Sequence, residues 1–417
     1  MRSTLPLIDA VTPVRRAALA FIFITVLLDI LAFGMIIPVL PHLIASFLGG
    51  DLSHAAIVHG LFASCFMVMQ FVFSPVQGAL SDRYGRRPVI LLSNLGLGLD
   101  FILMAVAHTL PLLFIGRLLS GITSASFSTA NAYIADVTPP EKRAAAFGKL
   151  GMAFGIGFVL APAIGGVLGH MSERLPFWIA AGLSLCNFCY GLFVLPESLP
   201  VERRAKYSWR RANPVSSLRF LGHHPEIFAL AGVIFLMQLA HIVYPSTFVL
   251  YADYRFGWGT DKVGYTLAGV GVLSAIVQGG LISRIIRAVG ERRTLLLGLG
   301  FGTLGFALYA LAPTGPWFWA AMPIAALWGI SMPAAQALMT RRVDANEQGR
   351  LQGAVVSLAS LAGIFGPTLF TRAFADVSSR HLHNGWAGVT FWMAALMLLG
   401  ALLLAWRSTR TDPAVVG

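Results

Sequence analysis

Long apolar runs constrain this chain more than any other feature of its sequence. Runs of roughly 20 residues with few charges recur along its whole length, and each is long enough to cross a hydrocarbon core of about 30 Å. Charged residues make up 12% of the 417 residues, roughly half the usual share of a soluble domain. The chain is therefore predicted to be an all-α integral membrane protein with twelve transmembrane helices. These are expected at 17–39, 55–79, 88–107, 110–136, 144–169, 176–195, 226–251, 261–283, 294–312, 316–340, 350–375 and 385–406.

The basic residues lie almost entirely on one side of this predicted membrane topology. Counted together with the adjoining span ends, the segments on the side of the two termini hold 24 of the 30 Lys and Arg residues and the opposite segments hold four. The remaining two lie well inside spans. This asymmetry is the positive-inside signature, and it predicts that both termini are cytoplasmic. We expect a multi-pass protein of a bacterial inner membrane. The net charge of +12 then reflects topology, and no nucleic-acid partner is expected.

The two halves of the chain are related in sequence. An offset of about half the chain length, found at several places, predicts two six-helix pseudo-repeats that share one orientation. We therefore divide the chain into an N-terminal half at 1–195, a hydrophilic cytoplasmic linker at 196–225 and a C-terminal half at 226–417. Three matching pairs lie 205 positions apart: Asn131 and Gln336, Gly148 and Gly353, and Pro162 and Pro367.

Three charged residues lie near the middle of predicted spans in the first half, away from the span ends. Asp29 falls in the first span, Asp100 in the third and Arg117 in the fourth, and their distances from the helix ends place them at similar depth. Because a charge in the bilayer is costly, such residues usually mark functional sites. We interpret Asp29 as a proton carrier that burial and Arg117 adjust to the working pH. For Asp100, proton coupling and a structural ion pair with Arg117 both remain open.

The second half has no comparable acid within a span and offers amide and aromatic side chains instead. Such residues suit a large, partly apolar ligand, although ordinary helix packing would use them equally well. His241 could titrate near neutral pH, and a hydrogen-bonded packing role is the alternative. The candidate substrate cavity is formed by Gln238, His241, Tyr244, Gln336 and Trp328.

The sequence does not predict an enzyme, a metal site or a cofactor. It contains no HExxH motif, no Walker A loop and no nucleophile elbow in a strand–turn–helix context. Cys186 and Cys189 have the spacing of a redox or metal pair, but no second pair or histidine cluster accompanies them. We expect them to be packing or lipid-facing residues.

Taken together, these segments resemble the major facilitator superfamily, and within it the drug:proton antiporters of the tetracycline-efflux type. The segment GALSDRYGRRP at 78–88 is similar to the signature loop between helices 2 and 3. The resemblance implies that Asp82 faces the start of helix 11 and that Arg86 reaches Asp136 at the end of helix 4. With Arg83, these residues would form a cytoplasmic gate, which must break for the site to open inward.

Two further segments carry the resemblance. Arg117 with Gly121 resembles the helix 4 motif whose arginine is tied to proton coupling. Residues 151–166 resemble the helix 5 motif of antiporters, which ends Gly-Pro-x-x-Gly-Gly, with Ala161 in place of its first glycine. Small residues at such intervals let helices approach closely, so packing alone could also explain them. The candidate residues of this antiporter helix are Gly157, Pro162, Gly165 and Gly166.

The resemblance implies proton-coupled efflux of a drug-like or amphipathic small molecule by alternating access. We expect the substrate, protons and the lipid bilayer as partners, and a monomer. Tetracycline exporters carry an acid in helix 9 and a histidine in helix 8, where this chain has Gly302 and Ser274, so we expect a substrate other than tetracycline. The alternative function is a proton- or sodium-coupled importer of a nutrient or metabolite with the same fold.

Overall fold

The structure is a computed structural model that describes residues 13–124, 126–139, 142–204, 221–222, 225–344, 347–380 and 385–410. In this part of the chain every long element is a helix. The first half contains α1 (Pro13–Ile36), α2 (Leu40–Phe47), α3 (Leu52–Tyr84), α4 (Arg86–Val106), α5 (Leu110–Thr123), α6 (Ser126–Val137), α7 (Arg143–Met171) and α8 (Leu175–Val194). A short 3-10 turn, η2 (Val201–Arg203), follows.

The second half repeats this pattern with more interruptions. It contains α10 (Pro225–His241), η3 (Tyr244–Phe248), α11 (Val249–Phe256), α12 (Thr260–Ile276), η4 (Val277–Leu281), α13 (Ile282–Leu311), α14 (Gly315–Ala326), η5 (Leu327–Ile330), α15 (Ser331–Thr340), α16 (Gln348–Ser379), η7 (Gly385–Gly388) and α17 (Val389–Ser408). The elements η3 and η4 are π-helical, and η5 and η7 are 3-10 helices.

These elements confirm the twelve predicted membrane crossings. Ten helical stretches of the described chain are long and apolar enough to span a bilayer. One of them, Thr260–Leu311, has 52 residues and contains a non-helical Gly290 (φ 79°, ψ 165°), so it makes two crossings. The remaining crossing is made by α5 and α6, which lie on either side of residue 125, a position outside the described residues.

The pseudo-repeat is visible in the backbone at the predicted offset of 205 residues. Gly85, between α3 and α4, has φ 108° and ψ 160°, and Gly290 occupies the equivalent place with nearly the same dihedral angles. A positive φ is open to glycine at little cost, so both tight turns depend on it. Each half also has a proline inside its fifth long helix, Pro162 in α7 and Pro367 in α16. The first crossing of each half is interrupted after equivalent residues, Ile36 and His241.

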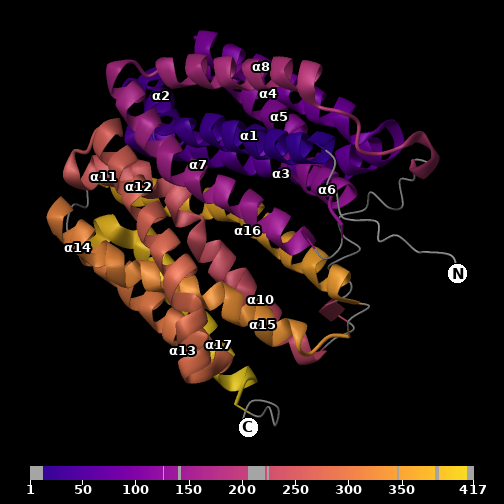
Figure 1. Cartoon of the computed structure of the whole chain (residues 1–417). Coiled ribbons are helices and arrows are strands. Elements are labelled where there is room, and N and C mark those ends of the chain that lie inside the picture. The colour runs from indigo at the N-terminus through magenta and orange to yellow at the C-terminus, as the bar shows by residue number, and fades with distance from the viewer. Residues whose placement is uncertain are drawn as a thin grey trace, which may run out of the picture.

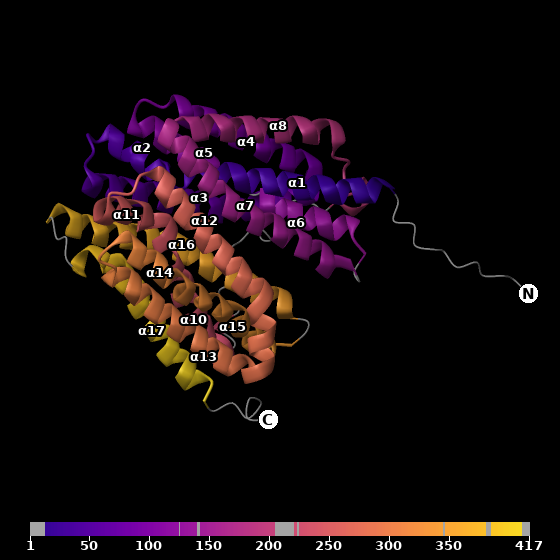
Figure 2. The same cartoon turned by 60° about the vertical axis from the view of Figure 1, so that its left-hand side comes forward.

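The two halves form separate helix bundles (Figure 1). Within the first half α1 packs on α7 and α4 on α8, and within the second half α17 packs on α10 and α13. The halves meet through α3 with α16 and α7 with α12. They lie close together where α2 and α11 are found, and they diverge toward the end that carries both termini (Figures 1 and 2). We call the end with α2 and α11, where the halves lie close together, the distal side, and the end where they diverge the termini side.

A charged cap begins α3 on the distal side. The Asp51 carboxylate accepts hydrogen bonds from the backbone N–H groups of Ser53 (2.9 Å) and His54 (3.0 Å), which the first turn of a helix leaves unpaired. The hydrogen bond with the His54 side chain, at 2.6 Å, holds the pKa of Asp51 below its usual range. The cap therefore keeps its charge at neutral pH and anchors the turn that separates α2 from α3.

Large apolar side chains cover the outside of the bundle, as a membrane requires. Leu92, Phe193 and Trp317 are 66%, 84% and 66% exposed, so their surroundings must be hydrocarbon rather than water. Cys186 and Cys189 are free thiols on the same kind of exposed surface. Most of the predicted linker at 196–225 lies outside the described residues, and its role stays a prediction.

Candidate transport site

A buried acid and a buried base lie where α4 and α5 cross. Asp100 is 1% exposed and Arg117 is 5% exposed. The Ser120 hydroxyl donates a hydrogen bond to the Asp100 carboxylate, and the Arg117 guanidinium lies over the Phe66 ring, with its Cζ 4.5 Å from the ring centroid. The two charges interact electrostatically, but Asp100 Oδ1 and Arg117 Nε have no hydrogen-bond partner among the described residues, and these two described side chains form no direct ion pair. The structure thus brings the predicted pair together without the direct neutralisation of a structural salt bridge.

A glycine permits this close crossing of α4 and α5. A Cβ atom at Gly116 would lie 2.8 Å from Asp100 Oδ1 and 2.8 Å from Met104 Cγ. Any larger residue would push the helices apart or displace the carboxylate, because packed interiors leave no spare space. The position of Asp100 therefore depends on a small residue directly beside Arg117 in the chain.

Asp29 is held from α8. The amide of Asn187 donates hydrogen bonds to Asp29 Oδ1 (3.1 Å) and to the carbonyl oxygen of Thr25 (3.2 Å), and the Asn187 side chain is fully buried. Asn187 is absent from the residues predicted from sequence, because the two cysteines that flank it form the more familiar motif. The sequence feature that could have indicated Asn187 is its polar amide within an otherwise apolar span. The predicted influence of Arg117 on Asp29 stays a prediction.

A histidine links the charged residues of the first half to the second half. His59 of α3 is 6% exposed, and its Nε2 lies 3.2 Å from the carbonyl oxygen of Pro245 in η3. His59 also interacts electrostatically with Arg117. His59 was not predicted from sequence either, since nothing along the chain shows that α3 packs against η3. It places the Arg117 cluster next to a contact between the halves.

Further contacts seal the halves together on the distal side. Each one ties a helix of the first half to a helix of the second, and a wider opening on this side would break them. They are Ser53 Oγ to the Ala375 carbonyl (3.0 Å), Ser64 Oγ with Thr368 Oγ1 (2.8 Å), Thr260 Oγ1 to the Gly166 carbonyl (3.1 Å) and His42 Nδ1 with Asp253 Oδ2 (3.7 Å).

The candidate residues of the antiporter helix fall on two faces of α7. Gly157 and Gly165 face α1, where a Cβ atom would clash with Ile30 and with the Met35 backbone. Gly166 faces α12, where a Cβ atom would clash with the Thr260 backbone. The carbonyl of Pro162 points to the same helix, close to where a Cβ of Gly264 would lie. One face thus packs α7 within its half, and the other forms part of the distal seal.

Arg86 organises the predicted gate on the termini side. Its guanidinium pairs with Asp82 (2.5 Å) and Asp136 (3.1 Å) and donates to Ser81 Oγ (2.7 Å), which joins α3, α4 and α6. Arg83 is exposed, with its Cζ 5.0 Å from the Tyr84 ring centroid. Within the described residues, these ion pairs stay inside the first half. Among the described residues, no hydrogen bond or ion pair joins Asp82 to the start of helix 11, and the halves diverge on this side, so that predicted contact stays a prediction.

Glu197 is a further member of this cluster that sequence reasoning missed. Its carboxylate accepts hydrogen bonds from the backbone N–H groups of Arg86 (2.8 Å) and Arg87 (3.3 Å), at the positive end of the α4 dipole. The Tyr133 hydroxyl donates to the neighbouring Pro196 carbonyl (2.9 Å). The first residues of the predicted linker therefore pack against the first half.

An aromatic cluster occupies the centre of the second half. The His241 ring lies 5.7 Å from Trp328 and 6.0 Å from Tyr244, and Phe306 lies 5.5 Å from Trp328 (centroid distances). Gln238 lies one turn before His241 on α10, and Gln336 lies on α15. Trp328 Nε1 has no hydrogen-bond partner among the described residues. Three of the five predicted cavity residues are thus brought into one cluster with an open donor.

Trp328 also explains the glycine at position 302. A Cβ atom at Gly302 would lie 2.8 Å from Trp328 Cδ1 and 2.8 Å from Leu398 Cδ1. The indole ring fills the space that a side chain at 302 would need. An acid at this position is sterically incompatible with the observed packing.

Comparison with known proteins agrees with this architecture. The family model described as Major Facilitator Superfamily matches residues 22–367. The chain is 39% identical to the class C tetracycline resistance protein of Escherichia coli, over 92% of this chain and 95% of that protein. It is 37% identical to the class G tetracycline resistance protein of Vibrio anguillarum, over 90% of this chain and 94% of that protein.

Solved structures share the fold at low sequence identity. A bacterial homologue of the human lysosomal transporter Spinster, in an inward-facing and occupied conformation, matches with a TM-score of 0.78 at 16% identity, covering 96% of this chain and 98% of that chain. The human organic anion transporter MFSD10 (TETRAN) matches with a TM-score of 0.68 at 24% identity, covering 94% and 100%. The chain belongs to the Major Facilitator Superfamily, is related within it to the tetracycline resistance proteins, and is a multi-pass membrane transporter rather than an enzyme.

Proposed function

We propose that this protein exports a drug-like, amphipathic small molecule in exchange for protons. Asp29, Asp100 and Arg117 would couple proton movement to transport. The observation that carries the proposal is the buried Asp100 and Arg117 pair, which is not directly neutralised and adjoins the contact between the halves through His59. Intramembrane charges of this kind are retained where a proton or an ion must move.

Alternating access accounts for the shape of the molecule. In this conformation the distal seal is formed and the halves diverge on the termini side (Figure 2). With the termini in the cytoplasm of a bacterial cell, this is an inward-facing state. The gate residues Asp82, Arg83, Arg86 and Asp136 would close the cytoplasmic side when the seal opens, and a monomer would suffice because both halves belong to one chain.

The aromatic cluster of the second half supports an aromatic, amphipathic substrate. His241, Tyr244 and Trp328 offer ring faces, and the free Nε1 donor of Trp328 suits an acceptor on the substrate. We propose that Gln238 and Gln336 complete this cavity. The relatives are named for tetracycline, so tetracycline is the first compound to test. The packing of Trp328 against Gly302 favours a different molecule of similar size.

Proteoliposomes holding the purified protein test the proposal. A pH-sensitive dye trapped in the vesicles reports proton movement when members of a diverse compound panel, including tetracycline, are added under an imposed pH gradient. We expect at least one amphipathic compound to move protons, and we expect protein-free vesicles and vesicles with a collapsed gradient to give no signal. Accumulation of a nutrient with sodium, with no proton movement for any compound, would establish the importer alternative instead.

A further inference from the structure

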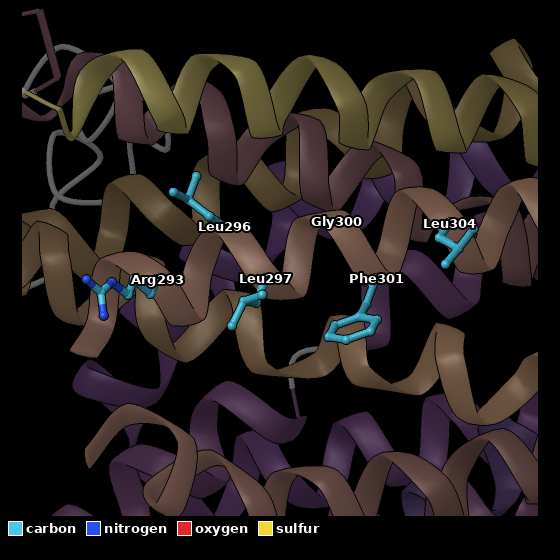
Figure 3. A pocket seen from close by; sticks show the side chains of 6 residues that line it. All are labelled: Arg293, Leu296, Leu297, Gly300, Phe301 and Leu304. Carbon is cyan, nitrogen blue, oxygen red and sulfur yellow. The ribbon is translucent and has the colours of Figure 1, made fainter. Parts of the chain in front are cut away.

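A groove runs along one flank of α13 (Figure 3). Its volume is about 470 Å³. Figure 3 shows the Arg293 side chain at one end and Leu304 at the other, with Leu297 and Phe301 between them. The lining residues recur every three or four positions and so share one face of the helix. They are Arg293, Leu296, Leu297, Gly300, Phe301 and Leu304.

This face of α13 is turned toward the membrane. Leu297 and Leu304 are 47% and 50% exposed, whereas Leu295 and Leu299 on the other side of the helix are fully buried. The residues from 293 to 304 rise about 16 Å along a helix, at about 1.5 Å per residue. A bilayer core is about 30 Å thick, so the groove has the length of one leaflet and of one acyl chain.

Positive charge gathers at the Arg293 end of the groove. Arg293 is exposed, and Arg292 donates from Nε to Thr409 Oγ1 (3.1 Å), which brings the end of α17 alongside. The neighbouring acid, Glu291, is already paired with Arg341 at 2.7 Å. Arg410 of the same region lies with its Cζ 5.0 Å from the Trp406 ring centroid. Exposed arginine and tryptophan side chains at a helix end match the headgroup region of a membrane.

We propose that this groove binds an anionic phospholipid of the leaflet on the termini side. The headgroup phosphate would lie on the Arg293 guanidinium, which is suited to a bidentate contact with phosphate oxygens. One acyl chain would lie along Leu297, Gly300 and Leu304. A zwitterionic lipid has the same phosphate and acyl chains but adds a cationic amine. The positive charge of Arg293, Arg292 and Arg410 therefore favours the lipid with a net negative headgroup. The proposal does not depend on the transported substrate.

Gly300 provides a direct test of the acyl-chain position. A Cβ atom at Gly300 would meet no atom within 4 Å, and Gly300 lines the groove, so Gly300→Phe is designed to place its ring where the acyl chain would lie. Gly182 of α8 is exposed, and a Cβ atom there would likewise meet no atom within 4 Å, so Gly182→Phe is the matched control on the other half. Native mass spectrometry of the full chain would count the phosphatidylglycerol and phosphatidylcholine molecules retained from mixed vesicles. We expect Gly300→Phe to lose retained phosphatidylglycerol and Gly182→Phe to keep it.

The headgroup contact is tested in the same measurement. Arg293→Gln should weaken retention of phosphatidylglycerol about fivefold, as expected for one basic residue at a membrane surface, and leave phosphatidylcholine unchanged. Arg287→Gln is the matched control, since Arg287 is exposed on α13 outside the groove and donates to the Ser283 carbonyl. Equal losses in Arg287→Gln and Arg293→Gln would overturn the proposal, as would equal retention by Gly300→Phe and Gly182→Phe.

Discussion

Asp29→Asn is expected to abolish substrate-driven proton movement while the protein stays folded. The substitution keeps the size and hydrogen-bonding shape of the side chain, so the Asn187 amide keeps a partner. It removes the only atom group at this position that can take up and release a proton. Removal of a positioned acid–base group commonly lowers a rate by about two orders of magnitude or more. Proton flux in proteoliposomes should fall to that of protein-free vesicles.

A matched control separates this loss from a general effect of removing an acid. Asp376 lies at the distal end of α16, where its side chain is 58% exposed and pairs with Arg380. Asp376→Asn should therefore transport at the wild-type rate, and both variants should show the wild-type melting transition. Wild-type coupling in Asp29→Asn would show that Asp29 is not the proton carrier, and Asp100→Asn would then be the next variant to measure.

The sequence predicts the membrane crossings well and the helix ends poorly. Hydropathy detects the apolar part of each crossing, so twelve spans and the parallel repeat could be predicted. It does not detect polar helical turns outside the bilayer, and α3 continues to Tyr84 although its predicted span ends at residue 79.

The residues of the site that lie on neighbouring helices could be predicted, whereas those joined only by tertiary packing could not. Asp100 and Arg117 lie on helices joined by a short turn, so their common depth follows from the rise of a helix. His59, Asn187 and Glu197 each act on a residue far away in the chain, and only tertiary packing brings them together. The conformation was beyond sequence reasoning altogether, because one sequence must form both the inward-facing and the outward-facing state.

The second large effect is expected at Gly166, where α7 of the first half packs directly on α12 of the second half. A Cβ atom at this position would clash with the Thr260 backbone and lie 2.9 Å from Gly264 Cα, so Gly166→Ala must separate α7 from α12. Overpacking of this kind costs about 1–3 kcal/mol. A strain of that size, present only while the distal seal is closed, shifts the balance toward the distally open state by about 5- to 150-fold. Substrate transport should fall, because the seal can no longer form fully.

Three glycines on α7 make this result decisive. Spin labels at Ser172 and Arg380, on distal ends of opposite halves, would report the opening as a longer distance in a chain without its native cysteines. Gly155→Ala, where a Cβ atom meets nothing within 4 Å, should leave that distance unchanged. Gly165→Ala, which clashes with Met35 inside the first half, should lower the melting temperature without lengthening it. If Gly166→Ala gives the same distances as Gly155→Ala, the contact of α7 with α12 does not control whether the distal side closes. The hydrogen bonds of His59 and Ser64 must then hold the distal side closed.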